Sequence, residues 1–210
     1  MLQPLDGGDA VALTDGESPS YLPDGRMLVL QGNSLVAIPV DVASRRVTGE
    51  PAVVLHDVAS LGGAAQYSVS DQGTLIYVPS SVASESLAGL HKVSRDGGST
   101  ELTGMTRQYS DPRLSPDAQR LALHLPDHHN DVWIKDLQRG TLTRLSFGLL
   151  EDETPVWSPD GKWLAYSGWC GASDDSRCVF KRRADGAAEA AVLWKTGAHI
   201  HVTDWSPDAR

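Results

Sequence analysis

Residues 152–166 read DETPVWSPDGKWLAY, and the rest of the chain repeats the pattern of this stretch. An apolar run ends at Trp157, the turn sequence Ser-Pro-Asp-Gly follows, and a second apolar run begins at Trp163. Proline suits the second position of a turn because its ring fixes φ at about −65°, and glycine tolerates the φ that the exit needs. The stretch therefore predicts a β-hairpin.

The same hairpin recurs along the sequence. Its copies end at Gly25, Gly73, Ala118, Gly161 and Ala209, which places them 48, 45, 43 and 48 residues apart. A period in the forties with one hairpin per copy is typical of the four-stranded antiparallel blades of a β-propeller. We therefore predict an all-β chain, a β-propeller of four complete four-stranded blades plus a partial fifth blade formed from the chain ends.

The repeat also predicts the domain organisation. We expect one domain over residues 1–210, with blades at 15–57, 63–104, 108–147 and 151–197, and a partial blade formed by 1–14 with 199–210. Both ends cut through a repeat and would expose strand edges, so we expect a fragment of a longer protein. Either the ends close a five-bladed ring, which is the favoured alternative, or two chains complete each other as a homodimer.

Charge and hydropathy exclude two classes of partner. The formal net charge of −9 argues against nucleic acid, because phosphate binding needs a basic stripe. The one basic run, residues 181–183, is interpreted as a solvated strand end. No apolar run approaches the roughly 20 residues of a membrane span, and residues 1–6 lack the features of an export signal. We therefore expect no membrane span and no signal in this chain.

The two cysteines, Cys170 and Cys178, flank a short segment between two strand-like runs. A hairpin of this shape can place the sulfurs opposite each other, and a disulfide would fit an extracytoplasmic compartment. The alternative is a pair of reduced thiols on neighbouring strands, and both interpretations stay open. Two cysteines alone do not provide the ligands of a zinc site.

Two motifs carry a family resemblance. The PVWSPDG sequence at 155–161 resembles the hallmark of the TolB-type propeller repeat, and NDVWIKDL at 130–137 is similar to the third strand of that repeat. Residues 33–41 and 66–77 are especially similar to the C-terminal propellers of bacterial Ser/Thr kinases, with Asn33 where glycine is usual. The resemblance covers essentially the whole chain, but the kinase motifs themselves are absent.

This resemblance implies a function and a location. TolB-type repeats suggest a non-enzymatic binding or scaffold module, part of a larger bacterial protein, that binds a protein or peptide at the channel face of the propeller. The parent protein is expected to be periplasmic or otherwise extracytoplasmic. ATP chemistry is not implied, because the glycine pairs of the chain lack the spacing of a phosphate-binding loop.

The channel mouth is the predicted place for a metal. Inner strands line the channel of a propeller. Aligning the copies on their turns gives equivalent positions, just before the inner strands, to Glu17, Ala65, Ser110, Glu153 and His201. His199 lies two residues before His201, so both imidazoles share one face of an extended strand. The predicted ligands of a divalent metal, zinc or calcium, are thus Glu17, Glu153, His199 and His201. The alternative is a wet channel ringed by polar residues that bind nothing.

A bound metal defines the second functional hypothesis, a metal-dependent hydrolase of esters, lactones or phosphotriesters. A metal lowers the pKa of its water to about 7 and so generates a nucleophile. No further cofactor is expected, and no catalytic residue is assigned: the sequence has no Gly-x-Ser-x-Gly elbow and no legible Ser-His-Asp triad. A second histidine cluster, His124, His128 and His129, is predicted to lie in a solvated loop of the third blade.

Overall fold

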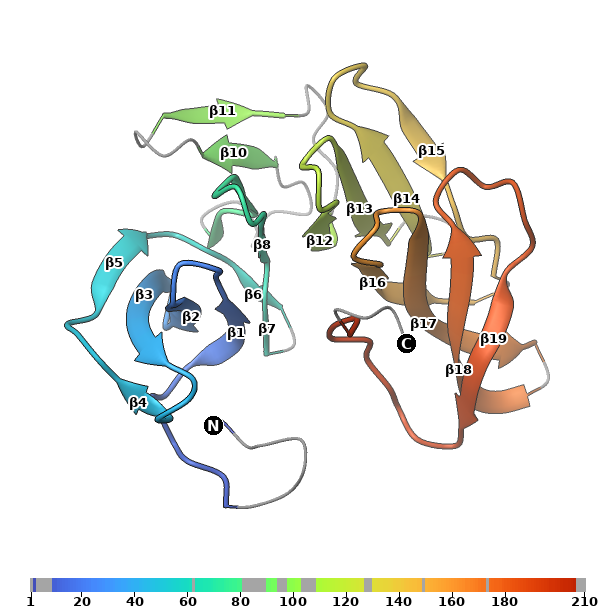
Figure 1. Cartoon of the computed structure of the whole chain (residues 1–210). Helices are drawn as coiled ribbons and strands as arrows, with labels where there is room; N and C mark the ends of the chain where they lie inside the picture. The colour runs from blue at the N-terminus through green and yellow to red at the C-terminus, as the bar shows by residue number, and fades with distance from the viewer. Residues whose placement is uncertain are drawn as a thin grey trace. The chain divides into compact units, whose positions relative to one another are not determined.

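The computed structural model describes residues 2, 9–61, 63–80, 90–93, 98–102, 109–126, 130–148, 150–172 and 174–206 (Figure 1). The chain divides into two compact units, unit 1 over residues 1–66 and unit 2 over residues 67–210. Nearly all regular structure in the described ranges is antiparallel β-sheet. Within the same ranges, no helix is long and apolar enough to cross a membrane.

Unit 1 contains one blade. Its strands are β1 (Glu17–Tyr21), β2 (Arg26–Gln31), β3 (Ser34–Asp41), β4 (Arg46–Val47) and β5 (Ala52–Leu55). The first three pair in sequence order, and both β4 and β5 pair with β3. Alternate residues of β2 and β3, including Val29, Val36 and Ile38, are buried in one apolar cluster. A short ladder of β6 (Ser60–Leu61) and β7 (Ala64–Ala65) follows.

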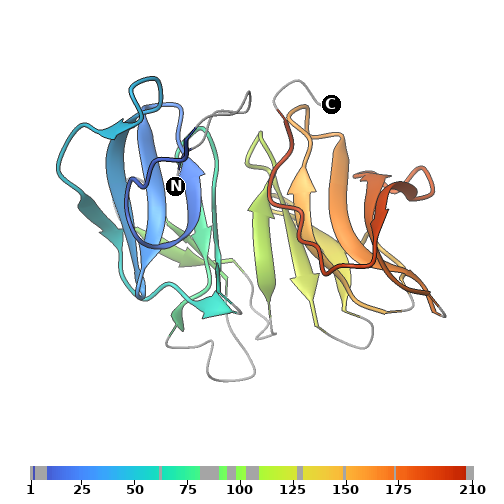
Figure 2. The same ribbon diagram turned by 90° about the horizontal axis from the view of Figure 1, so that it is seen from below.

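Unit 2 contains three blades of four strands each. The first consists of β8 (Tyr67–Val69), β9 (Leu75–Tyr77), β10 (His91–Val93) and β11 (Ser99–Glu101). The second consists of β12 (Ser110–Leu114), β13 (Arg120–Leu125), β14 (Asp131–Asp136) and β15 (Leu142–Arg144). The third consists of β16 (Asp152–Trp157), β17 (Trp163–Gly171), β18 (Asp174–Arg183) and β19 (Ala191–Thr196). Consecutive strands pair antiparallel within each sheet, which is the order of a propeller blade (Figure 2).

These sheets confirm the predicted all-β propeller of four blades. The partial fifth blade is not confirmed. Among the described residues near the N-terminus, only a single bridge joins Leu2 to Val11. The extended strand expected to carry His199 and His201 in this blade is wrong, because residues 199–206 form no ladder. Instead, the backbone N–H of Val202 donates to the side-chain oxygen Oγ1 of Thr154 at 3.1 Å, so that a hydroxyl holds this extended segment.

The predicted turn chemistry explains the hairpins. In the last blade, Ser158 donates its hydroxyl to Asp160 Oδ1 at 2.6 Å, and the same hydroxyl oxygen accepts from the backbone N–H of Trp163 at 3.0 Å. Gly161 has φ of 65°, which glycine adopts without strain. Its N–H closes the turn on the Ser158 carbonyl at 2.8 Å. The hydrogen bond from Ser158 holds the pKa of Asp160 below its usual value.

A buried cluster fixes β16 against the preceding blade. Trp157, Leu164 and Tyr166 from the last blade are buried with residues of β13 and β14 and with Leu145, which follows β15. The indole Nε1 of Trp157 donates to the carbonyl of Arg113 in β12 at 2.9 Å. Burying each large apolar side chain stabilises the fold by about 1.5–3 kcal/mol. The end of β16 is therefore held firmly, and the candidate site lies at the opposite end of this strand, at Glu153.

Candidate metal centre

A backbone bulge sets the position of Glu153. Three inner strands share a residue with φ of 49–51°, namely Ser18, Asp111 and Thr154. The register shifts directly after the residues that precede them, which are Glu17, Ser110 and Glu153. A bulge leaves one residue unpaired and redirects the neighbouring side chains. The alignment of the sequence copies thus corresponds to a repeated backbone geometry.

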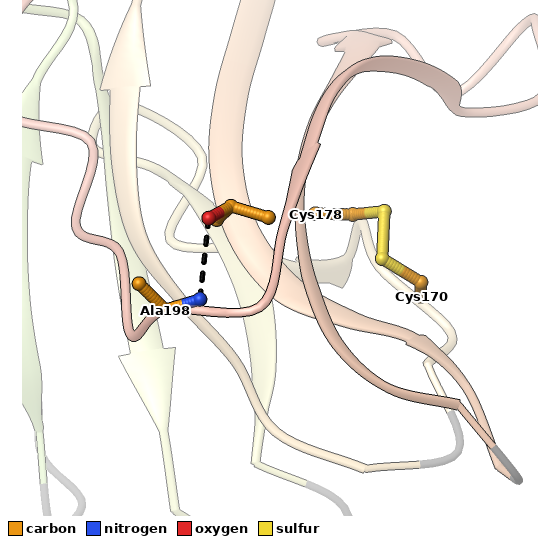
Figure 3. Close-up of a disulfide and its surroundings, with 4 residues drawn as sticks. Cys170, Cys178 and Ala198 are labelled. Carbon is orange, nitrogen blue, oxygen red and sulfur yellow. Dashed lines mark hydrogen bonds between the residues drawn. A yellow bond between two sulfur atoms is a disulfide. The ribbon is translucent and has the colours of Figure 1, made fainter.

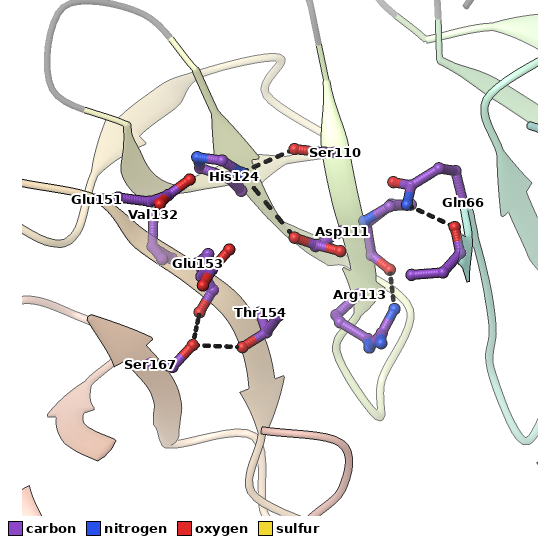
Figure 4. Close-up of polar contacts among 12 residues, drawn as sticks. Gln66, Ser110, Asp111, Arg113, His124, Val132, Glu151, Glu153, Thr154 and Ser167 are labelled. Carbon is purple, nitrogen blue, oxygen red and sulfur yellow. Dashed lines mark hydrogen bonds and ion pairs between the residues drawn. The ribbon is translucent and has the colours of Figure 1, made fainter. Parts of the chain in front are cut away.

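The hydroxyl of Thr154 connects three segments at this bulge. Its Oγ1 lies 2.8 Å from Ser167 Oγ on β17, and it accepts the N–H of Val202. Ser167 Oγ also lies 3.3 Å from the Glu153 carbonyl oxygen, to which it can donate. Figure 4 shows these contacts between β16 and β17. Because His201 directly precedes Val202, this hydrogen bond places the imidazole of His201 beside the Glu153 carboxylate.

Glu153, His199 and His201 bring their ligand atoms within 4.8 Å of one another. His199 Nε2 lies 3.5 Å from Glu153 Oε1, and the two imidazole centroids are 4.6 Å apart. Metal–ligand bonds of about 2.0–2.2 Å at tetrahedral angles separate two ligand atoms by about 3.4 Å. The Glu153–His199 pair already has this spacing. The wider spacings require rotation of His199 and His201, both of which are exposed.

Arg177 on β18 shapes the electrostatics of the carboxylate. Its side chain is 8% exposed and lies over the ring of Trp169. Its Nη1 is 3.8 Å from Glu153 Oε1, and its Nη2 is 3.7 Å from Glu151 Oε2. Burial raises the pKa of Glu153, the Glu151 charge raises it further, and the side chains of His201, Arg177 and His199 act in the opposite direction. A divalent cation would add to the stabilisation of the ionised form.

The predicted ligands are only partly brought together. Glu153, His199 and His201 form the group described above. Glu17 lies in unit 1, where its carboxylate accepts a hydrogen bond from Ser60 Oγ at 2.6 Å, and its role in a metal site stays a prediction. The three-residue set provides two nitrogen ligands and one oxygen ligand. It leaves coordination positions open for water or a ligand.

The prediction for His124 is wrong. His124 lies within β13 and is 7% exposed, not in a solvated loop, whereas His128 and His129 lie outside the described residues. Both faces of β13 are buried from Leu121 to Leu125, and the Nδ1 of His124 lies 2.8 Å from Ser110 Oγ and 3.9 Å from Asp111 Oδ2 (Figure 4). A catalytic triad requires serine and aspartate on opposite ring nitrogens. Both groups approach the same nitrogen here, so this arrangement is not a triad.

Cys170 and Cys178 form a disulfide between β17 and β18 (Figure 3). Cys178 is also paired with Lys195 on β19, at the strand end that leads to His199. A turn follows, in which the N–H of Ala198 donates to Thr196 Oγ1 at 3.2 Å. The disulfide therefore links β17 to β18, and β18 pairs with β19, from whose end the histidine segment departs.

Sequence reasoning missed Arg177 and the hydroxyl of Thr154. Arg177 is on the third strand of its blade, whereas the predicted ligands occupy the positions just before the inner strands. Its contact with Glu153 depends on the antiparallel pairing of Trp169 with Arg177, which cannot be read from spacing alone. The one available signal was the lone arginine beside Cys178 in the disulfide hairpin.

Comparison with known proteins bears on the fold. No family model matches the chain. An uncharacterised protein of Agrobacterium fabrum is 24% identical over 156 residues, which cover 72% of this chain and 50% of the relative. The chain thus spans about half the length of the curated relative that it matches.

Solved structures with a similar fold include three propellers of low identity. TolB from Acinetobacter baumannii has a TM-score of 0.65 and 13% identity, covering 84% of this chain and 42% of TolB. An oligogalacturonate lyase in complex with manganese has a TM-score of 0.65 and 16% identity, covering 91% of this chain and 56% of the lyase. A putative TolB from Agrobacterium tumefaciens has a TM-score of 0.54 and 16% identity, covering 92% of this chain and 86% of that protein.

Proposed function

Because the chain has the fold of a TolB-type β-propeller and brings Glu153, His199 and His201 together, we propose that it is a binding module with one divalent metal ion. The observation that carries the proposal is the convergence of these three side chains, with His199 Nε2 already 3.5 Å from Glu153 Oε1. Three protein ligands leave coordination positions free. The bound partner would supply an oxygen or nitrogen atom to such a position.

The donor set favours zinc or manganese over calcium. Imidazole nitrogens suit zinc and other transition metals, whereas calcium prefers six to eight oxygen ligands. This choice of ions is supported by the oligogalacturonate lyase of similar fold, which was solved in complex with manganese. We therefore propose Zn²⁺ or Mn²⁺ as the resident ion and expect Ca²⁺ to bind weakly.

Calorimetric titration of the chelator-stripped full chain tests the proposal. We expect one Zn²⁺ or Mn²⁺ per chain, and little heat with Ca²⁺. Changes to groups that only support metal ligands already cost about 10–100-fold in affinity. Glu153→Gln, His199→Ala and His201→Ala should therefore each weaken binding by at least about tenfold.

A matched control separates this site from general histidine binding. His56 is an exposed histidine of unit 1, and its Nδ1 lies 3.0 Å from Ser34 Oγ. His56→Ala should leave the affinity unchanged. Equal losses in His56→Ala and His199→Ala, or undiminished binding in Glu153→Gln, would contradict the proposed site.

The open coordination also favours a second candidate, a metal-dependent hydrolase of esters, lactones or phosphotriesters. A metal of this kind would lower the pKa of its bound water to about 7. The Glu153 carboxylate is 12% exposed, and low solvation strengthens electrostatic effects at such a centre. Turnover of an activated ester, a lactone and a phosphotriester, abolished by chelator and by Glu153→Gln, would support catalysis. Metal binding without turnover would contradict the hydrolase and retain only the binding module.

The disulfide supports an extracytoplasmic location for the parent protein. Disulfides persist in oxidising compartments and are rare in the cytosol. We propose that the metal-bearing surface faces a protein, a peptide or a small ester in such a compartment, and that two chains can associate. Sedimentation of the purified chain at several concentrations tests the association.

A further inference from the structure

Unit 2 contains a pocket of about 560 Å³ that is separate from the metal centre. This volume is in the range of small-molecule sites, about 300–1,000 Å³. Its walls come from β16, β17, β18 and the loops that precede β16 and β19. Four aromatic residues line the pocket, Phe147, Tyr166, Trp169 and Phe180, together with three charged ones, Asp152, Arg182 and Glu189.

The aromatic residues form one wall and the rim. Tyr166 and Phe180 stack with ring centroids 5.4 Å apart and an interplanar angle of 25°. Phe147 is 60% exposed at the rim, although it is large and apolar. The guanidinium groups of Arg144 and Arg182 lie 4.8 and 5.2 Å from its centroid and hold it there. An apolar ligand therefore meets aromatic surface on two sides.

Asp152 provides a fixed carboxylate in the wall of the pocket. The residue is 3% exposed, and the backbone N–H of Gly148 donates to its Oδ2 at 3.2 Å. A Cβ on Gly168 would lie only 2.1 Å from its Oδ1, so the absence of a side chain at Gly168 makes room for the carboxylate. Successive residues of a strand point to opposite faces. Asp152 therefore faces the pocket while Glu153 faces the metal centre.

The charges around the pocket leave one negative charge uncompensated. Asp131 and Arg144 form a close ion pair at 2.6 Å and cancel each other. Arg182 donates to the carbonyls of Leu145 at 2.5 Å and Ala188 at 3.1 Å, which fixes its single positive charge. Against it stand two carboxylates, Asp152 and Glu189, so the sum over the three lining charges is −2 + 1 = −1.

We propose that this pocket binds a small organic monocation with an apolar body, an arylalkylammonium or a similar amine. The ammonium group compensates the excess carboxylate charge, and the apolar body stacks on Tyr166, Phe180 and Phe147. A cation close to aromatic faces gains about 0.5–2 kcal/mol when it is partly desolvated. An anionic ligand gains none of this and is repelled by the carboxylates.

The test compares three ligands of one shape on the full chain, with chelator present to silence the metal centre. The probes are 2-phenylethylamine, 2-phenylethanol and phenylacetate, titrated calorimetrically. We expect the amine to bind about tenfold more tightly than the alcohol, because both carboxylate attraction and cation–π contact require the charge. Phenylacetate should bind weakest. Equal affinity for amine and alcohol, or no detectable binding of the amine, overturns the proposal.

Two exposed residues of the pocket allow variants that keep the fold intact. Phe147→Ala should weaken amine binding about fivefold, and Glu189→Gln about threefold. Their matched controls, Tyr21→Ala and Glu50→Gln, change equally exposed residues of unit 1 and should have no effect. Far-UV circular dichroism checks the fold of each variant. Full amine affinity in both pocket variants overturns the assignment to this pocket.

Discussion

Reduction of the disulfide between Cys170 and Cys178 should measurably destabilise the last blade. The two cysteines lie 8 positions apart in the sequence, and the disulfide closes the hairpin between β17 and β18. Those strands also pair from Trp163↔Arg183 to Trp169↔Arg177, so the native ladder survives without the covalent link. The main loss is therefore the constraint that the disulfide puts on the unfolded chain.

The magnitude follows from the length of the closed loop. The entropy that a disulfide removes from the unfolded chain is about 2.1 + 1.5R ln n cal/mol/K. With n of 8 this sum is about 8.3 cal/mol/K, or about 2.5 kcal/mol at 25 °C. Because the folded contacts stay the same, the denaturant midpoint should shift accordingly.

Urea unfolding of the same protein, oxidised and reduced with a phosphine, measures this difference. Unfolding is followed by tryptophan fluorescence and circular dichroism. The double variant Cys170→Ala/Cys178→Ala serves as the control, because a reductant should not change its midpoint. A loss below about 1 kcal/mol on reduction would refute the reasoning, since it would mean that the loop is already constrained in the unfolded chain.

Three further predictions concern residues near the site. Thr154→Val removes the acceptor of the Val202 N–H, so unfolding should cost about 1–2 kcal/mol less and metal affinity should fall; calorimetry showing full affinity would contradict this role. Gly168→Ala places a Cβ 2.1 Å from the Asp152 carboxylate and should destabilise the chain by about 2–3 kcal/mol in urea titration, much less when combined with Asp152→Ala. Burial raises the pKa of Asp152 to about 6, above its unfolded value of 3.8, so its contribution to stability is fully present below pH 3.8 and is lost as the pH rises through 6. The stability of the metal-free wild type relative to Asp152→Asn should therefore fall by up to about 3 kcal/mol from pH 3.5 to pH 7, and a flat difference would disprove it.

The blades were predictable because their signals are local. A turn such as Ser158 to Gly161 carries its own hydrogen-bond donors and acceptors, and the alternation in β14 indicates which face is buried. Neither signal depends on residues far away in the sequence.

The site was predictable only where the repeat itself carried the information. The equivalent positions of Glu153 and His201 in their repeats follow from the period of the sequence. The bulge at Thr154 explains why the Glu153 side chain faces His201. The burial of His124 and the approach of Arg177 to Glu153 depend on packing between strands that occupy different places in their blades. The strand expected to carry His199 and His201 does not form, because a strand needs a backbone partner and the side-chain hydroxyl of Thr154 takes that place.

Anomalous diffraction from crystals grown with Zn²⁺ is the most direct test of the metal centre. The account predicts one strong peak per chain, about 2.0–2.2 Å from an oxygen of Glu153 and from one nitrogen each of His199 and His201. A crystal in which these three side chains converge without a peak, or in which the ion sits only on other histidines, would contradict it.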